Sequence, residues 1–440
     1  MELISLSKRK FKLDAKNKVA ACFSAAVALV LILAVVLITI LSGRGDVTKS
    51  GELLKSVNDD RRSGSKVDAE FKKQYSDFCL SVIEKCAESD ENTAFSLTNA
   101  MSAAALMAYG ADGVTESQIE KVIGGDGLQT AKALSGIEKR IFAKSSKSGV
   151  RFSNTVWLNS SALYGIKKTF LRADKKYFGL GVVRESFAES QTFDSAVRAV
   201  TDATSGNTMP TIDFQQTQYM NIVSGASFVS KWKEQADEKA TFSNLFTGAK
   251  EQTEGTFFRT LEKGYITGEN FVGITKEYND DFTFVGLLPK NKTDDETSTV
   301  ADIVAELRET GNFSKLLTVA KDSAVSVTLP YYIDSVNTPT TTNLSKIFKQ
   351  LGAEDIFTKS AELKNMANNS RNLHLDSFTA SGDISITPAG SCSATSEGKA
   401  VSEDKLSQSK NSVIFDRSFI YFVVDNETEL PVYFAILNNI

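Results

Sequence analysis

Apolar residues recur with helical spacing early in the chain and with strand-like alternation later. Phe71, Tyr75, Phe78, Val82 and Cys86 share one helical face, which predicts a helix over 71–87. A second, alanine-rich helix is predicted to run through Met107. The later part of the chain predicts strands at 152–159, 181–187, 219–228, 255–260, 264–275, 281–288 and 324–329, and helices at 167–177, 300–310 and 341–351.

This order of elements predicts the fold class. Helices come first and mixed strands follow, which is typical of an α+β protein with large, mostly antiparallel sheets. Thr115 with Gln118 three residues later predicts a capping box at the start of another helix. The domain is predicted to span 69–440, and its 42% hydrophobic content is enough for a large core.

The N-terminus predicts the cellular compartment. Residues 1–18 hold six lysines and arginines, and residues 19–41 hold no charge over 23 positions. At about 1.5 Å per residue this run is long enough to cross a bilayer. We therefore predict a basic cytoplasmic segment (1–18), a signal anchor (19–42) and a polar linker (43–68), with the domain outside the cell. A cleaved signal peptide, which would release the domain, is the alternative.

The rare residue types exclude several kinds of chemistry. The chain has one histidine, His374, interpreted as an ordinary strand-surface residue, so neither a histidine-based protease nor a metal site is expected. A net charge of −4 gives no electrostatic footprint for nucleic acid, so no nucleic-acid partner is predicted. Cys79 and Cys86 are predicted to be buried free thiols, since two helical turns separate them by roughly 10 Å. No cofactor is expected, and the protein is predicted not to be an enzyme.

The most informative stretch lies near the C-terminus. Small residues occupy 390–396, a polar tract follows at 397–411, and two apolar strands are predicted at 418–425 and 430–437. A long exposed loop between buried strands is usually functional. Composition alone is also compatible with a disordered surface loop that only connects the neighbouring strands.

Several motifs in one order resemble the serpins over nearly all of 69–440. They are Asn-Thr-Ala-Phe-Ser at 92–96, the stretch 223–232 that ends in Trp232, the strand 282–289 that ends in Leu-Pro, the pair 325–331 and 351–357, and the closing 425–426 and 434–438. This resemblance implies that 388–412 is a reactive loop. A protease would cut this loop, and the cut strand would insert into the main sheet and distort the protease.

The resemblance also implies site residues. The hinge would be Gly390, Ser391, Cys392, Ser393, Ala394, Thr395 and Ser396, and the reactive bond would join Asp404 to Lys405. The region where the sheet opens would include Ser96, Asn99, Ser224, Trp232 and Ala380. Three of these depart from the family pattern, since Asn99 replaces a serine, Ser224 an asparagine and Ala380 a histidine. Ser96 as a simple helix N-cap and Trp232 as a simple core aromatic are the alternatives.

The hinge itself departs from the pattern. Pro388 and Ala389 replace an acidic start, Cys392 replaces a glutamate, and Glu397 and Lys399 share the face of Ser391 that would turn inward. A non-inhibitory serpin-fold scaffold or binding protein on the cell surface is therefore the alternative to an inhibitor. The implied partner is a serine protease or a cysteine protease, and a monomer is expected.

Overall fold

Two large sheets dominate the computed structural model, which describes residues 46–57, 67–144, 149–161, 164–291, 297–318, 321–334 and 340–440. Residues 47–440 form one compact unit, separate from residues 1–46. The seven-stranded sheet is arranged in the order β14 (Thr340–Asn343), β16 (Ser377–Gly382), β7 (Met220–Lys231), β4 (Gly149–Asn159), β6 (Gly181–Glu185) and β2 (Gly51–Glu52), with β18 (Gly390–Ser391) also paired to β7.

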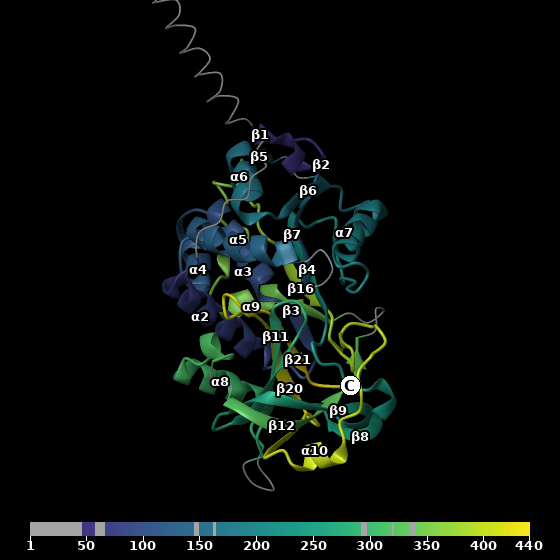
Figure 1. Cartoon of the computed structure of the whole chain (residues 1–440). Coiled ribbons are helices and arrows are strands. Elements are labelled where there is room, and N and C mark those ends of the chain that lie inside the picture. Colours follow the sequence, from purple (N-terminus) through teal and green to yellow (C-terminus); the bar gives the residue numbers. More distant parts are fainter. Residues whose placement is uncertain are drawn as a thin grey trace, which may run out of the picture. The chain divides into compact units, whose positions relative to one another are not determined.

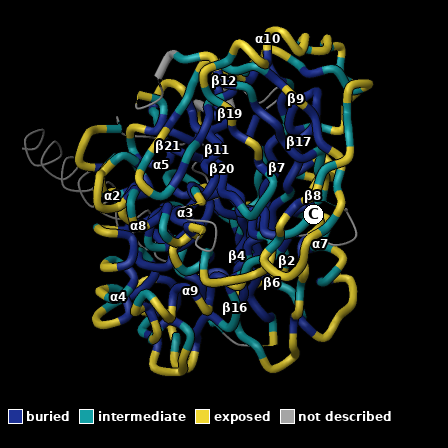
Figure 2. The backbone as a smooth tube through the Cα atoms, turned by 90° about the horizontal axis from the view of Figure 1, so that it is seen from below, coloured by how far each residue is buried: buried dark blue, intermediate teal, exposed yellow. Residues whose placement is uncertain are grey.

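The nine-stranded sheet contains the most apolar strands. Its order is β19 (Asn411–Ile414), β12 (Lys321–Pro330), β9 (Gln252–Thr267), β10 (Phe271–Glu277), β11 (Phe282–Pro289), β20 (Phe419–Asp425), β21 (Leu430–Leu437) and β3 (Thr93–Ser96), with β8 (Phe242–Thr247) paired to β9. Every residue of β11, β20 and β21 is buried, as continuous apolar runs predict. Figure 2 shows these strands in the buried interior of the unit.

Helices cover the sheets. In Figure 1, α2, α3, α4 and α5 lie together on one side, and α10 lies near β12 and β9 at the end of the unit opposite to β2. The helices are α2 (Ala69–Cys86), α3 (Leu97–Gly110), α4 (Gly113–Ile123), α5 (Gly127–Lys144), α6 (Lys168–Ala173), α7 (Ser190–Ala203), α8 (Val300–Thr310), α9 (Leu344–Gln350) and α10 (Glu403–Ser407). The short elements are η1 (Leu53–Ser56), η2 (Asp174–Phe178), η3 (Glu238–Ala240), η4 (Phe313–Lys315), η5 (Asp355–Phe357), β1 (Asp46–Val47), β5 (Gly165–Lys167), β13 (Tyr332–Ile333), β15 (Ala367–Asn368) and β17 (Ser385–Ile386).

The predicted α+β class is confirmed, and the helices predicted near 71–87 and 300–310 are present as α2 and α8. The predicted capping box is wrong, because α4 begins two residues before Thr115. Thr115 Oγ1 instead accepts a hydrogen bond from the Glu362 backbone N–H at 3.0 Å. Gln118 Oε1 accepts one from the Asp355 N–H at 2.9 Å. Both side chains therefore connect α4 to a distant segment.

Part of the predicted linker belongs to the folded unit. Strand β2 pairs antiparallel with β6, and Leu53 and Val57 are buried in the main core. The Lys175 ammonium donates a hydrogen bond to the Val57 carbonyl at 3.1 Å. Residues 51–57 therefore cover the edge of the seven-stranded sheet, and the expectation of a free tether there is corrected. The rest of the linker, 58–66, lies outside the described residues.

Within the described ranges, no helix combines the length and apolarity needed to cross a bilayer. The segment 19–42, which was predicted to do so, lies outside those ranges.

Burial of Leu53 leads to the first prediction. Leu53→Ala should lower the free energy of unfolding by about 2–5 kcal/mol, because it leaves a cavity between η1 and the core. Lys55→Ala is the matched control at an exposed neighbour and should change it by less than about 0.5 kcal/mol. Urea unfolding of both variants measures the difference. Equal effects would mean that 51–57 does not pack on the domain in solution.

Candidate functional site

The two central strands of the seven-stranded sheet separate towards one end. Strands β16 and β7 run parallel and pair from Ser377 with Asn221 to Gly382 with Ala226. Beyond Gly382 the chain leaves β7, and β17 pairs with β13 instead. We call this divergence the fork; its two sides are 227–231 and 383–386. The fork is where an added strand would enter the sheet.

The hinge begins inside the fork. Gly390 and Ser391 pair antiparallel with Lys231 and Ser230, at the end of β7. Gly390 has a φ of +151°, and a Cβ atom there would lie 2.2 Å from the Ser230 carbonyl oxygen. Only glycine fits this close approach. The first two residues of the predicted hinge are therefore already part of the sheet.

An aromatic pair holds the start of the hinge. The Trp232 indole N–H donates to the Thr387 carbonyl at 2.8 Å, and the Trp232 backbone N–H donates to the Ala389 carbonyl at 2.9 Å. The Tyr278 ring stacks on Trp232 at 4.2 Å, and its hydroxyl lies 2.7 Å from Ser391 Oγ. Burial raises the pKa of Tyr278, which keeps this hydroxyl protonated as a possible donor. Trp232 is thus a core aromatic that also contacts the hinge.

A buried lysine completes this cluster. Lys276 is 2% exposed, and its ammonium contacts the Glu262 carboxylate and donates to the Glu234 carbonyl at 2.9 Å. It also lies 5.3 Å from the centre of the Trp232 ring. Removing either member of a buried ion pair would leave an uncompensated charge. The sequence does not predict a role for Lys276 or Tyr278, because no local pattern distinguishes them from other residues in or near strands.

The rest of the hinge leaves the sheet. Cys392 is half-buried, and Ser393, Ala394 and Thr395 are exposed. The chain is then bound again, since the Ser396 N–H donates to Glu238 Oε2 at 3.1 Å and the Glu397 N–H donates to Gln235 Oε1 at 2.9 Å. The reactive loop is therefore attached to the body at 396–397 as well as at the fork.

The predicted reactive bond lies in α10. The Asp404 carbonyl accepts a hydrogen bond from the Gln408 N–H at 3.1 Å, and the Lys405 N–H donates to the Ser402 carbonyl at 3.0 Å. A protease binds the scissile carbonyl in its own oxyanion hole. A helical bond does not present its carbonyl in this way, so α10 must unwind before Asp404–Lys405 can react.

The other predicted sheet-opening residues divide into two groups. Asn99, Ser224 and Ala380 come together where β7 pairs with β16, and Asn99 Nδ2 lies 3.4 Å from Ser224 Oγ. The amide and the hydroxyl have exchanged positions relative to the family pattern, and they still face each other. Ser96 instead accepts the Asn99 N–H as N-cap of α3 at 3.3 Å and donates to the Val432 carbonyl at 3.1 Å. It therefore connects α3 to the other large sheet.

His374 is not a strand-surface residue as expected. It is 9% exposed, and its Nε2 lies 3.2 Å from Asp376 Oδ1. The hydrogen bond that His374 Nε2 donates to the Asp376 carboxylate raises the pKa of His374. Asp376 also accepts the N–H groups of Tyr219 and Met220, where β7 begins. The histidine therefore supports the end of the sheet opposite to the fork.

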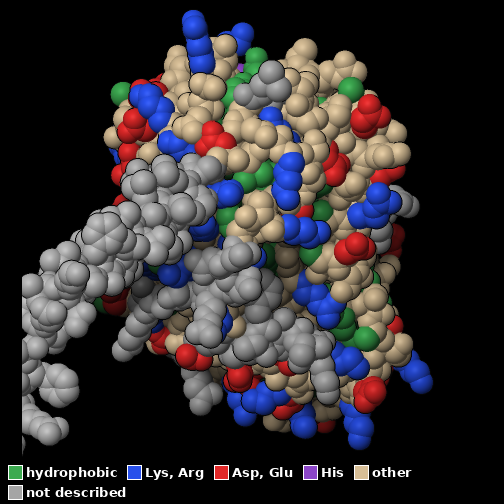
Figure 3. Space-filling model, turned by 90° about the horizontal axis from the view of Figure 1, so that it is seen from above, with side chains coloured by type: hydrophobic (Ala, Val, Ile, Leu, Met, Phe, Trp, Pro, Cys, Tyr) green, Lys and Arg blue, Asp and Glu red, His purple; other side chains and the backbone are tan. Residues whose placement is uncertain are grey.

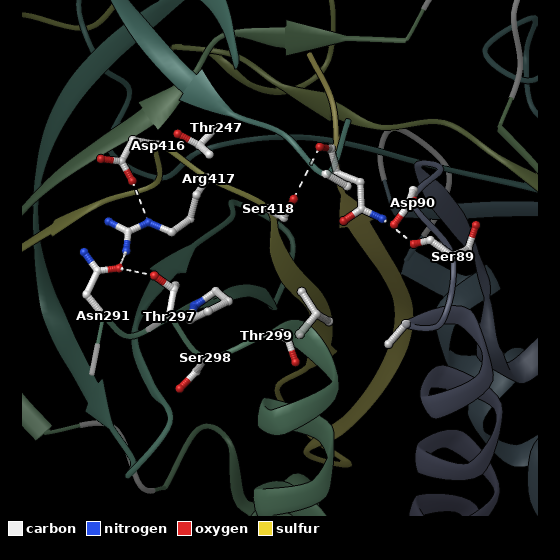
Figure 4. Close-up of a pocket in the computed structure, with 15 residues that line it drawn as sticks. Ser89, Asp90, Thr247, Asn291, Thr297, Ser298, Thr299, Asp416, Arg417 and Ser418 are labelled. Atoms are coloured by element: carbon white, nitrogen blue, oxygen red, sulfur yellow. Dashed lines mark hydrogen bonds and ion pairs between the residues drawn. The ribbon is translucent and has the colours of Figure 1, made fainter. Parts of the chain in front are cut away.

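A separate cavity of about 660 Å³ lies between the end of α2, the start of α8 and the start of β20. Figure 4 shows its polar lining, in which Arg417 points between Asp416 and Asn291. Arg417 is thus already paired with an acidic group. None of the residues lining this cavity comes from 388–412.

The face seen in Figure 3 has mixed charge. Among its described side chains, lysines and arginines alternate with acidic residues, and hydrophobic side chains are visible only in small areas. This visible area therefore presents neither an extended apolar surface nor a surface of one charge sign.

Comparison with known proteins identifies the family. The family model for serpins, described as serine protease inhibitors, matches residues 73–440. The chain therefore belongs to the serpin family.

Individual relatives are distant. Human neuroserpin is 21% identical over 355 residues, which cover 77% of this chain and 84% of that protein. The crystal structure of tengpin, a thermophilic serpin in its native state, has a TM-score of 0.79 at 21% identity and covers 89% of this chain and all of that one. Human thyroxine-binding globulin has a TM-score of 0.71 at 16% identity and covers 84% of this chain and 98% of its own. At these identities the structural neighbours establish the fold alone.

Asp383, at the base of the fork, leads to the second prediction. It accepts a hydrogen bond from Thr208 at 3.3 Å, and burial, with the nearby Asp334, raises its pKa from 3.8 to about 8. The native state therefore keeps a proton that the unfolded chain releases. Stability from this group is complete below pH 3.8 and is lost as the pH rises through about 8. Asp383→Asn stays neutral and should reduce the loss of unfolding free energy between pH 5 and pH 8.

Urea unfolding at both pH values measures this loss. Asp194→Asn changes an exposed carboxylate on α7 and should keep the wild-type pH dependence. An unchanged pH dependence in Asp383→Asn would show that Asp383 does not retain its proton in the native state.

Proposed function

We propose that this chain inhibits serine proteases as a suicide substrate. The protease would cut the reactive loop, and the cut strand would enter the fork beside β7. The observation that carries this proposal is the antiparallel pairing of Gly390 and Ser391 with β7, since an inserted strand would continue this pairing. Membership of a family described as serine protease inhibitors supports an inhibitor over an enzyme.

The chemistry of the loop supports insertion at its start. Residues 391–396 are small and uncharged, so they fit between β7 and β16 after these strands separate. Insertion must be faster than hydrolysis of the acyl-enzyme. Glu397 and Lys399 would enter later, on the same face as Ser391, and burying an unpaired charge costs several kcal/mol. These two charges should therefore limit the efficiency of inhibition.

Incubation with a panel of purified secreted serine proteases tests the proposal. We expect a covalent complex that survives denaturing electrophoresis, and a large rise in Tm after loop cleavage. If every protease that cuts the loop leaves no complex and no rise in Tm, the inhibitor proposal is wrong.

A binding function is the second candidate. The cavity shown in Figure 4 has a volume within the range of small-molecule sites, and hydroxyl, amide and carboxylate groups line it. Polar ligands would suit this lining better than apolar ones. Failure to inhibit any protease, together with ligand-dependent stabilisation that Asn291→Leu abolishes, would favour a binding protein.

We also propose an extracytoplasmic location, on the basis of the six basic residues before an uncharged run at 19–41. In the folded unit, β2 and α10 lie at opposite ends (Figure 1). A membrane tether joined to the N-terminus of this unit would therefore leave α10 accessible to a soluble protease. A cleaved signal peptide would release the same domain.

The third prediction concerns the hinge. Ser393 lies two residues after the buried Ser391, so strand alternation would turn it into the sheet on insertion. Ser393→Arg should slow insertion, because the buried cation would have no partner. The loop should still be cut, but the fraction of protease held in the stable complex should fall by about tenfold or more.

Ser393→Thr is the matched control, since it keeps a small hydroxyl side chain, and it should inhibit like wild type. Equal complex formation by the arginine variant would contradict insertion of this residue.

The fourth prediction concerns topology. Protease added outside intact cells that express the full chain should remove the domain if the anchor is retained. The culture medium should contain the domain if the segment is cleaved. A domain that is protected inside intact cells would exclude both versions of the proposal.

A further inference from the structure

The reactive loop contains three lysines; Lys410 directly precedes β19, where Asn411 pairs with Val325, and the structure gives the peptide bonds of the other two different conformations. Lys405 lies in α10, whereas Lys399 lies in the non-helical stretch 395–402. Both side chains are exposed, so a protease that selects lysine can contact either one. Which bond is cut first therefore depends on the backbone.

The bond after Lys405 is protected by packing. Leu406, the next residue, is 9% exposed, and α10 lies against β12. Glu403 forms an ion pair with Arg259 of β9 at 2.8 Å, and the Arg259 guanidinium lies 4.7 Å from the Phe242 ring centre. Proteases bind their substrates in extended form, so cleavage here requires Leu406 to leave its contacts and α10 to unwind.

The peptide bond after Lys399 is accessible to a protease. The preceding residues are bound to the body, because Gln235 and Glu238 accept the N–H groups of Glu397 and Ser396. Gly398 lies so close that a Cβ atom there would be 2.3 Å from the Gln235 carbonyl oxygen. Lys399 and Ala400 are exposed and non-helical immediately after this contact. Among the described loop residues, neither the Lys399 carbonyl nor the Ala400 N–H takes part in a hydrogen bond that would need to break.

Cleavage after Lys399 leaves a shorter strand for insertion than cleavage after Asp404. Strand β7 has twelve residues. Cleavage after Asp404 leaves fourteen residues beyond Gly390, enough to run the length of β7, whereas cleavage after Lys399 leaves only nine. Because Gly390 faces Lys231, continued antiparallel pairing would place Lys399 opposite Ile222, two residues or roughly 7 Å before the far end of β7, whereas Asp404 would lie beyond that end. An attached protease would then stop about 17 Å short of the position that cleavage after Asp404 allows.

We propose that Lys399–Ala400 is a cleavage site for trypsin-like proteases that inactivates the chain as an inhibitor; this rests on the inhibitory function proposed above. The protease serine forms an ester with the Lys399 carbonyl, and Ala400 accepts a proton and leaves as a free amine. Water then hydrolyses the ester and leaves a carboxylate on Lys399. The protease is regenerated because the shortened strand ends within β7 and does not carry it past the far end of that strand.

Trypsin and two single variants of the whole folded domain test this inference. In wild type, mass spectrometry should find the first cut after Lys399, with little stable complex. Lys399→Gln should slow the first cleavage by about tenfold or more, since trypsin selects a basic residue at that position. The remaining cleavage should move into 404–406. Lys405→Gln is the matched control and should leave the cut after Lys399 unchanged.

The outcomes separate the two proposals. A first wild-type cut after Lys405, or an unchanged cleavage rate in Lys399→Gln, overturns the inference. If Lys399→Gln also increases the fraction of protease in the stable complex, cleavage after Lys399 is the inactivating route. If that variant is cut within 404–406 and gives neither a complex nor a rise in Tm, the inhibitory function fails, and Lys399–Ala400 is then a cleavage site without an inactivating role.

Discussion

The candidate site depends on the part of β7 that extends beyond its pairing with β16. Strand β16 stops pairing with it at Ala226, although β7 continues to Lys231. Backbone donors and acceptors in a buried sheet require partners, so this part of β7 can bind another strand. Gly390 and Ser391 take the last two positions. The site is therefore an incomplete sheet whose next strand is supplied by the same chain.

The contacts around Trp232 determine how firmly Gly390 and Ser391 are held against β7. Two of its N–H groups bind hinge carbonyls, and Tyr278 contacts the Ser391 hydroxyl. The buried Lys276, which is paired with Glu262, lies over the same ring. Because these groups are buried, releasing the hinge would leave polar atoms without partners. The cluster thus favours the partly inserted hinge over a fully expelled one.

The loop beyond the hinge combines bound and free segments. The contacts of 396–397 with Gln235 and Glu238 restrict its first half, and α10 with the Arg259–Glu403 ion pair restricts its second half. Between these two restrained parts, Lys399 and Ala400 are exposed and non-helical, as are residues 393–395 within the hinge. An exposed ion pair of this kind is worth less than about 1 kcal/mol, so it adds little to the packing of Leu406 that holds α10 in place.

The sequence by itself determined the α+β class and the long periodic elements such as α2, α8, β20 and β21, and it located the run of small residues at 390–396. Regular apolar spacing reports burial directly, and a run of small residues is visible without any structure. The tertiary structure decided the roles of Thr115 and Gln118, the packing of 51–57, the burial of His374 and the helix at the predicted reactive bond. Each of these depends on partners far away in the sequence. A short polar segment carries no periodicity that would identify such partners, so only the fold could assign them.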